Sequence, residues 1–96
     1  MVNIDLFKGE LKKSVESNKL NIGSKTTKKL IQNSLIEKVY MSKNIDLNIK
    51  SDIEHFCKIG NINFENLDID SSELGILCKK NFNITVISFK KWRKLN

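Results

Sequence analysis

Residues 21–29, NIGSKTTKK, hold the side chains of this 96-residue chain that are best suited to chemistry. Gly23 follows a short apolar segment and precedes hydroxyls and lysines, which predicts a strand-to-helix turn. The free backbone N–H groups of such a turn suit a phosphate. Lys25 and Lys29 are four residues apart and would project from one helical face, with Lys28 beside them. The first turn holds no carboxylate, although the partial positive charge of a helix N-terminus usually favours one there. The stretch therefore indicates a polyanionic partner.

The same stretch does not match a nucleotide-binding loop. GSKTTKK lacks the two glycines and the Gly-Lys-Ser/Thr ending of a P-loop. The small hydroxyls of Ser24, Thr26 and Thr27 would let a bulky ligand approach and could hydrogen-bond it. On these residues alone, an ordinary first helical turn with solvated lysines is the simpler interpretation.

Two other polar stretches contain candidate contact residues. Asn44, in the segment SKNID after a predicted strand, could bond a base edge or a phosphate. A turn-forming asparagine is the more common role at such a position. Phe82, in the segment KKNF, is a lone aromatic beside two lysines, which is what base stacking needs, although a core phenylalanine is the more common outcome.

Other polar clusters do not have the spacing of a catalytic or metal site. His55 and Cys57 are two residues apart on a predicted helix, so they point to different faces and form no dyad. Asp68, Asp70 and Ser72 alternate like the start of a calcium loop, but Lys79 stands where such a loop ends in glutamate. We therefore expect neither catalysis, nor a metal, nor another cofactor.

Composition favours a small basic domain of a reducing compartment. The net charge is +6 and the sequence pI is about 9.4, which suggests a polyanion as partner, although part of the charge could reflect a general bias toward lysine. The N-terminus lacks the apolar core of a signal peptide, and residues 84–89, ITVISF, are too few to span a bilayer. We expect no membrane partner. Cys57 and Cys78, far apart, are expected to be buried free thiols.

Helices and strands alternate four times along the chain, which predicts an α/β domain whose sheet is covered by helices. We expect a single domain over residues 1–96, with residues 90–96, KKWRKLN, as a basic tail. The apolar patterns predict helices over 5–17, 24–34, about 48–59 and about 71–78, and strands over 19–22, 36–41, about 62–64 and 84–89.

Several residues are assigned to faces and caps by this pattern. Phe7, Leu11 and Val15 form the expected core stripe of the first helix. In the strand over 36–41, Val39 and Met41 share one face, while Ile36 and Tyr40 share the other. Asn48 is the expected cap of the third helix, and Asp70 opens a capping box with Glu73.

Three stretches, taken in order, resemble one family. They are GSKTTKK after the first strand, SKN followed by IKSDIEHF, and SSELGIL with NF five residues beyond Leu77. From about residue 8 to residue 89, the chain is similar to the archaeal and eukaryotic type of large-subunit ribosomal protein thirty, within a larger group of kink-turn RNA binders. The resemblance implies a three-layer α-β-α sandwich around a central mixed four-stranded sheet, with a binding surface built from three loops at one end.

The resemblance also implies an RNA-binding role for particular residues. The glycine-lysine motif of the family falls on Gly23, Ser24, Lys25, Thr26 and Lys29, with Lys28 adjacent. Its base-contacting asparagine falls on Asn44, and the position that packs on an unstacked nucleotide falls on Phe82. The chain departs from the family at Asp46 and Leu47, where a proline is usual, and at Lys79 and Lys80, where a glycine is frequent.

The function implied is that of a non-enzymatic, cytoplasmic constituent of the large ribosomal subunit. Its expected partners are ribosomal RNA with a kink-turn or internal loop and neighbouring ribosomal proteins, without a small-molecule substrate. Two alternatives remain open. One is a kink-turn-binding core protein of another ribonucleoprotein, such as a snoRNP or RNase P, and the other is a small basic domain that binds a protein.

Overall fold

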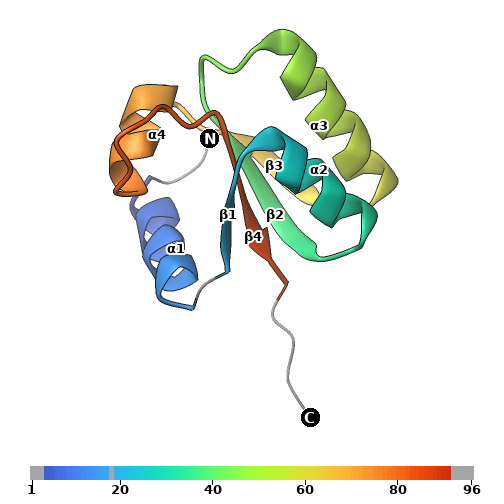
Figure 1. Ribbon diagram of the computed structural model, residues 1–96, viewed down its shortest axis with the longest axis horizontal. Coiled ribbons are helices and arrows are strands. Elements are labelled where there is room, and N and C mark those ends of the chain that lie inside the picture. The colour runs from blue at the N-terminus through green and yellow to red at the C-terminus, as the bar shows by residue number, and fades with distance from the viewer. Residues whose placement is uncertain (1–3, 18, 92–96) are drawn as a thin grey trace.

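The predicted alternation of helices and strands is confirmed. The computed structural model describes residues 4–17 and 19–91. The elements, in chain order, are α1 (Ile4–Glu16), β1 (Leu20–Ile22), α2 (Ser24–Gln32), β2 (Ile36–Met41), α3 (Leu47–Ile59), β3 (Asn63–Asn66), α4 (Ser71–Leu77) and β4 (Val86–Lys90). Figure 1 shows the helices on either side of the sheet.

The sheet is mixed, with strand order β1-β4-β2-β3. Strand β4 runs antiparallel to both of its neighbours, and β2 runs parallel to β3. Strands β1, β2 and β3 therefore share one direction and β4 has the other. As a result, the carboxyl ends of β1, β2 and β3 lie at the same end of the sheet as the start of β4.

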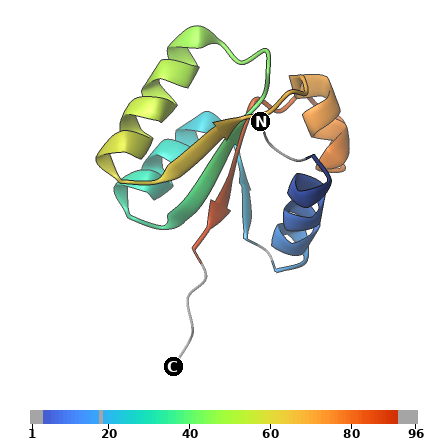
Figure 2. The same ribbon diagram turned by 180° about the vertical axis from the view of Figure 1, so that it is seen from behind.

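Each face of the sheet carries its own apolar core. Helices α1 and α4 cover one face, and α2 and α3 cover the other (Figures 1 and 2). The first core includes Phe7, Leu11, Tyr40, Leu74 and Ile87. The second includes Ile31, Val39, Met41, Ile53 and Cys57. This is the three-layer α-β-α sandwich that the resemblance implied, and burial on both faces holds the central strands rigidly in place.

One prediction about the faces of β2 is wrong. Val39 and Met41 lie in the core under α2 and α3, and Tyr40 lies in the core under α1 and α4, as alternation requires. Ile36 was expected beside Tyr40 but lies in the core with Val39. The cause is an irregularity of the β2–β4 register between Ile36 and Lys38, which changes the face on which the first residue of the strand lies.

The predicted cap of α3 is also wrong. The cap is Asp46, whose carboxylate accepts hydrogen bonds from the backbone N–H groups of Asn48 at 2.8 Å and Ile49 at 3.4 Å. A carboxylate complements the positive end of the helix better than an amide does. The predicted cap of α4 is confirmed, since Asp70 accepts from the N–H of Glu73 at 2.9 Å.

The core stripe of α1 is confirmed at two of three positions. Phe7 and Leu11 are buried, but Val15 is 50% exposed and Ser14 is buried in its place. Helix α4 ends at Leu77, so an open groove lies beside the last turns of α1. Val15 lines that groove.

The ends of the described chain bear on two further predictions. Lys90 is the last residue of β4, so it is part of the sheet and not of a tail. Most of the predicted tail, residues 92–96, lies outside the described residues. Within the described part of the chain, each helix is too short or too polar to cross a bilayer.

Candidate nucleic-acid interface

Backbone hydrogen bonds join the turns at the end of the sheet where β1, β2 and β3 finish. The N–H of Gly23 donates to the carbonyl of Val86 at 2.9 Å, and the N–H of Ser42 donates to the carbonyl of Thr85 at 2.8 Å. The turns after β1 and β2 are thus fixed to the segment that enters β4. We call residues 23–26, 42–46, 67–70 and 81–85 the loop end.

Asn44 ties the turn after β2 to the start of α4. Its Oδ1 accepts from the backbone N–H of Ser71 at 2.8 Å and from the hydroxyl of Ser42 at 3.2 Å. Its Nδ2 donates to the Ser71 hydroxyl at 3.1 Å. These contacts use most of the hydrogen-bonding capacity of the side chain and leave one amide proton for a ligand.

Phe82 lies in the segment between α4 and β4, and its side chain is 53% exposed. A Cβ atom on Gly75 would overlap the carbonyl oxygen of Phe82, so only glycine lets this segment pack against α4. The turn that leaves α4 places Lys79 at φ 60°, a left-handed conformation that favours the glycine frequent in the family. The N–H of Ile84 then donates to the carbonyl of Ser71 at 3.0 Å, which closes the segment onto the loop end.

Helix α2 begins directly after Gly23, whose φ of 109° and ψ of 150° are accessible mainly to glycine. This residue makes no side-chain cap hydrogen bond, so the amides of the first turn are not capped by a side chain. Ser24 is half-buried, while Lys25 and Thr26 are exposed. The first turn therefore combines amides that lack a side-chain cap with an exposed hydroxyl and an exposed cation, a set that suits an anion.

Thr27 lies on the packing side of α2, where the helical spacing with Ile31 predicts it, and not among the hydroxyls that a ligand could reach. It is fully buried, and its hydroxyl donates to the carbonyl of Gly23 at 2.7 Å. The Thr27 hydroxyl also lies 3.0 Å from that of Ser88 in β4 and accepts from the Asn21 amide in β1 at 3.3 Å. This network holds α2 on the sheet, and Thr27 is too buried to contact a ligand. The sequence signal for this hydrogen-bond network is the presence of one polar residue in each of two predicted strands, Asn21 in residues 19–22 and Ser88 in residues 84–89.

The three lysines of α2 are not equivalent. Lys25 and Lys29 are exposed, whereas Lys28 is half-buried and its ammonium lies 3.0 Å from the Asp52 carboxylate on α3. The Asp52 charge offsets that of Lys28, so Lys25 and Lys29 supply the cationic character of this face.

Lys43 is a further cation of the loop end, and the sequence reasoning passed over it. It is exposed, and its N–H donates to the Ile69 carbonyl at 2.7 Å, which ties the turn after β2 to the turn after β3. The pKa of Asp70 is lowered, first by the hydrogen bond from the Glu73 N–H, then by the Ser72 hydroxyl, with a smaller contribution from Lys43. The only sequence signal for a role of Lys43 is its position directly before Asn44.

The two thiols are buried and free, as predicted. Burial raises the pKa of Cys57 to about 11, with a further contribution from Glu54, and burial also raises the pKa of Cys78. Among residues 4–17 and 19–91, no three histidine, cysteine, aspartate or glutamate side chains gather into a potential metal site.

An α-β-α sandwich whose turns at one end of the sheet carry the exposed Lys25, Lys43 and Phe82 is typical of a binding domain. Comparison with known proteins identifies the family of binding domains to which the chain belongs. The model of the ribosomal protein L7Ae/L30e/S12e/Gadd45 family matches residues 5–95, and the chain belongs to this family.

Several archaeal relatives are named large ribosomal subunit protein eL30. That of Sulfurisphaera tokodaii is 32% identical over 87 residues, which cover 91% of this chain and 82% of the relative. That of Saccharolobus solfataricus is 34% identical over 85% of this chain and 76% of the relative, and that of Sulfolobus acidocaldarius is 35% identical over 84% and 78%. Proteins of the large subunit are cytoplasmic, which agrees with the expected location. The family is not known to be enzymatic, which agrees with the expected non-enzymatic function.

Solved structures share the fold at lower sequence identity. The Giardia lamblia 15.5 kD RNA binding protein has a TM-score of 0.81 and is 16% identical, with 90% of this chain and 72% of that chain covered. A protein of unknown function from Bacillus halodurans has a TM-score of 0.77 at 21% identity, with 84% and 80% covered.

Proposed function

We propose that this protein is a structural constituent of the large ribosomal subunit that binds a kinked or bulged element of ribosomal RNA through its loop end. The observation that supports this proposal most is that backbone hydrogen bonds hold together the turn after β1, the turn after β2 and the segment before β4. This arrangement brings the uncapped start of α2, Asn44 and the exposed Phe82 to one end of the sheet.

The chemistry of the loop end suits bent RNA better than a regular duplex. The major groove of A-form RNA is too deep and narrow for side chains, so specific recognition uses bulges and unstacked bases. At a sharp bend the phosphates crowd together, and the start of α2 with Lys25 and Lys29 would neutralise them. Phe82 would stack on an exposed base, and the remaining amide proton of Asn44 would reach a base edge.

The names of the archaeal relatives favour the ribosome over another ribonucleoprotein. Three relatives at 32–35% identity are large-subunit proteins, whereas the likeness to the Giardia RNA binding protein at 16% identity shows the fold alone. Sequencing of RNA crosslinked to the protein in cells tests this assignment. Ribosomal RNA is expected, and recovery chiefly of a snoRNA or of RNase P RNA would point to the first alternative.

Binding in vitro tests the RNA structure that is recognised. We expect the full chain to bind a kink-turn duplex much more tightly than a fully paired duplex of equal length and charge. Equal affinities would contradict recognition of a bend and leave only electrostatic attraction. Association with a protein that survives RNase treatment, together with no RNA binding, would support the protein-interaction alternative instead.

Charge variants test which residues meet the phosphates. Lys25→Ala and Lys29→Ala should each weaken binding and reduce the slope of log K against log salt by roughly 0.7–0.9, the value of one lost phosphate contact. Lys28→Ala should have a smaller effect, because Asp52 already pairs with that lysine. Lys58→Ala, in the last turn of α3 away from the loop end, is the matched control. Unchanged slopes for Lys25→Ala and Lys29→Ala would exclude the start of α2 as the phosphate site.

A further inference from the structure

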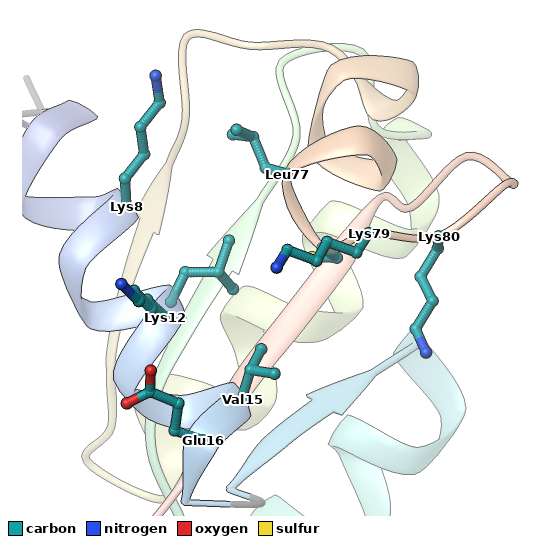
Figure 3. Close-up of a pocket in the computed structure, with 9 residues that line it drawn as sticks. Lys8, Lys12, Val15, Glu16, Leu77, Lys79 and Lys80 are labelled. Carbon is teal, nitrogen blue, oxygen red and sulfur yellow. The ribbon is translucent and has the colours of Figure 1, made fainter.

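A groove separates α1 from α4 on the face of the sheet opposite α2 and α3 (Figure 3). Its volume is about 570 Å³, which is in the range of ligand and peptide pockets. Its lining shares no residue with the loop end. It consists of Lys8, Leu11, Lys12, Val15, Glu16, Leu77, Cys78, Lys79 and Lys80.

The floor of the groove is apolar. On α1, Leu11 is buried and Val15 is 50% exposed, while Leu77 at the end of α4 is half-buried above the buried Cys78. Val15 therefore keeps half of its side chain in water, although it continues the apolar stripe that α1 presents to the core. A partner that covered Val15 and Leu77 would remove this apolar surface from water.

The rim of the groove is strongly basic. Lys8 and Lys12 are one turn apart on α1, and Lys79 extends from the end of α4 toward α1 (Figure 3). In the part of the chain that the structure describes, none of the four rim lysines, Lys80 included, takes part in an ion pair. Glu16 is the one carboxylate of the lining. The rim thus complements an acidic partner.

The lining distinguishes between two kinds of acidic partner. RNA bases stack on aromatic side chains or on arginine, and none of the nine lining residues is either. RNA would also place phosphates near Glu16. An amphipathic helix with a row of apolar side chains and acidic flanks matches both the floor and the rim, as in other helix-in-groove interactions.

We propose that the groove between α1 and α4 is a docking site for an acidic amphipathic helix of a partner protein. This site is separate from the loop end, so its occupation would leave the RNA surface free. The proposal does not depend on RNA binding by the loop end.

The test uses the full ¹⁵N-labelled chain and a panel of synthetic helices of about 15 residues, the length at which isolated helices become stable. The peptides carry glutamates beside apolar residues at i, i+4 and i+7, and the panel varies the apolar side chains. Charge-swapped lysine peptides and scrambled peptides are the controls. We expect saturable amide shifts confined to α1, α4 and the turn at Lys79, with affinity that falls as salt rises.

Variants locate the binding surface. Val15→Asp should weaken peptide binding by about tenfold, because it places a charge in the apolar floor. The double charge reversal Lys12→Glu/Lys79→Glu should do the same without touching the floor. Lys13→Glu, an exposed reversal on α1 outside the groove, should change the affinity less than about twofold. Val15→Asp, which lies in the groove and away from the loop end, should keep the RNA affinity close to that of the unmodified chain.

The proposal is overturned if no acidic peptide shifts the α1 and α4 amides, or if scrambled and lysine peptides shift them equally. Shifts of the groove amides by a short RNA, with none by peptide, would assign the groove to RNA instead. Concentration-dependent shifts of the same amides without any peptide would assign it to a second copy of the chain.

Discussion

Phe82 and Asn44 stand in neighbouring segments of the loop end, yet their side chains have different relations to the fold. Phe82 is about half exposed and has no part in either apolar core. Asn44 holds two segments together through Ser42 and Ser71. A substitution at Phe82 can therefore report on binding alone, whereas one at Asn44 must first be separated from its effect on stability.

Replacement of Phe82 by alanine should affect binding more than folding. We expect RNA affinity to fall by about 1–3 kcal/mol, the usual range for one base–aromatic stack. The loss of stability should be well below the roughly 3–5 kcal/mol expected for Phe7→Ala, because Phe7 is fully buried in the core. Denaturation midpoints and RNA dissociation constants of the two variants check this. A strongly destabilised Phe82→Ala with normal affinity would place Phe82 in the core.

The substitution Asn44→Asp separates the two roles of Asn44. Aspartate can still accept from the Ser71 N–H and the hydroxyls of Ser42 and Ser71, so stability should change by less than about 1 kcal/mol. It has no amide proton to donate, and its charge repels phosphates, so RNA affinity should fall. Asn44→Ala should lower both stability and RNA affinity, since the Ser71 N–H would be unpaired. If Asn44→Asp binds RNA as well as the unmodified chain, Asn44 is only a structural tie.

At the scale of the element, α4 positions the segment that carries Phe82. The helix is short, it begins at the Asp70 cap, and Gly75 provides the space that the Phe82 backbone occupies. The same shortness leaves α1 partly uncovered and opens the groove beside Val15. One element thus shapes both the proposed RNA surface and the proposed protein surface.

Two glycine-to-alanine substitutions test the role of this close approach. In Gly75→Ala the new methyl group collides with backbone, so we expect a loss of about 1–3 kcal/mol in stability and weaker RNA binding as the segment shifts. In Gly9→Ala the methyl group meets nothing within 4 Å, so the higher helix propensity of alanine should stabilise α1 by about 0.5–1 kcal/mol. Denaturant unfolding of both variants decides. Equal stability of the two would show that α4 and the segment can separate freely.

At the scale of the whole molecule, the two apolar cores determine how stability depends on pH in the alkaline range. Burial raises the pKa of Cys57 from 9.0 to about 11, and the pKa values of Cys78 and Tyr40 are raised for the same principal reason. The pKa of Lys38 is also raised, first by its interaction with Tyr40. Each of these groups therefore keeps its proton longer in the folded chain than in the unfolded chain.

The sign of the pH effect follows from that order of ionisation. Well below pH 9.0 the Cys57 thiol is neutral in both the folded and the unfolded state and contributes no pH dependence. Between 9.0 and about 11 it ionises in the unfolded chain first, so the free energy of unfolding should fall as the pH rises. Cys57→Ala, compared with the unmodified chain by denaturant unfolding across this range, should show a shallower decline. Identical declines would mean that the thiol is not desolvated in the folded state.

The sequence by itself determined the class of fold and the residues of the first helical turn. Apolar periodicity is a local property, so the alternation of helices and strands and the Asp70 cap could be predicted without a structure. The glycine-lysine stretch was recognisable because its conformation depends on Gly23 itself, whose φ of 109° few other residues adopt. The resemblance then supplied the arrangement of layers.

Only the tertiary structure decided which polar groups are available. Lys28 differs from its neighbours because Asp52, twenty-four residues later, lies against it. The Thr27 hydroxyl is unavailable to a ligand because it donates to the Gly23 carbonyl and lies 3.0 Å from the Ser88 hydroxyl. Val15 is exposed because another helix stops short. Each outcome depends on partners that are distant in the chain, and the local spacing that predicts helices and strands contains no information about them.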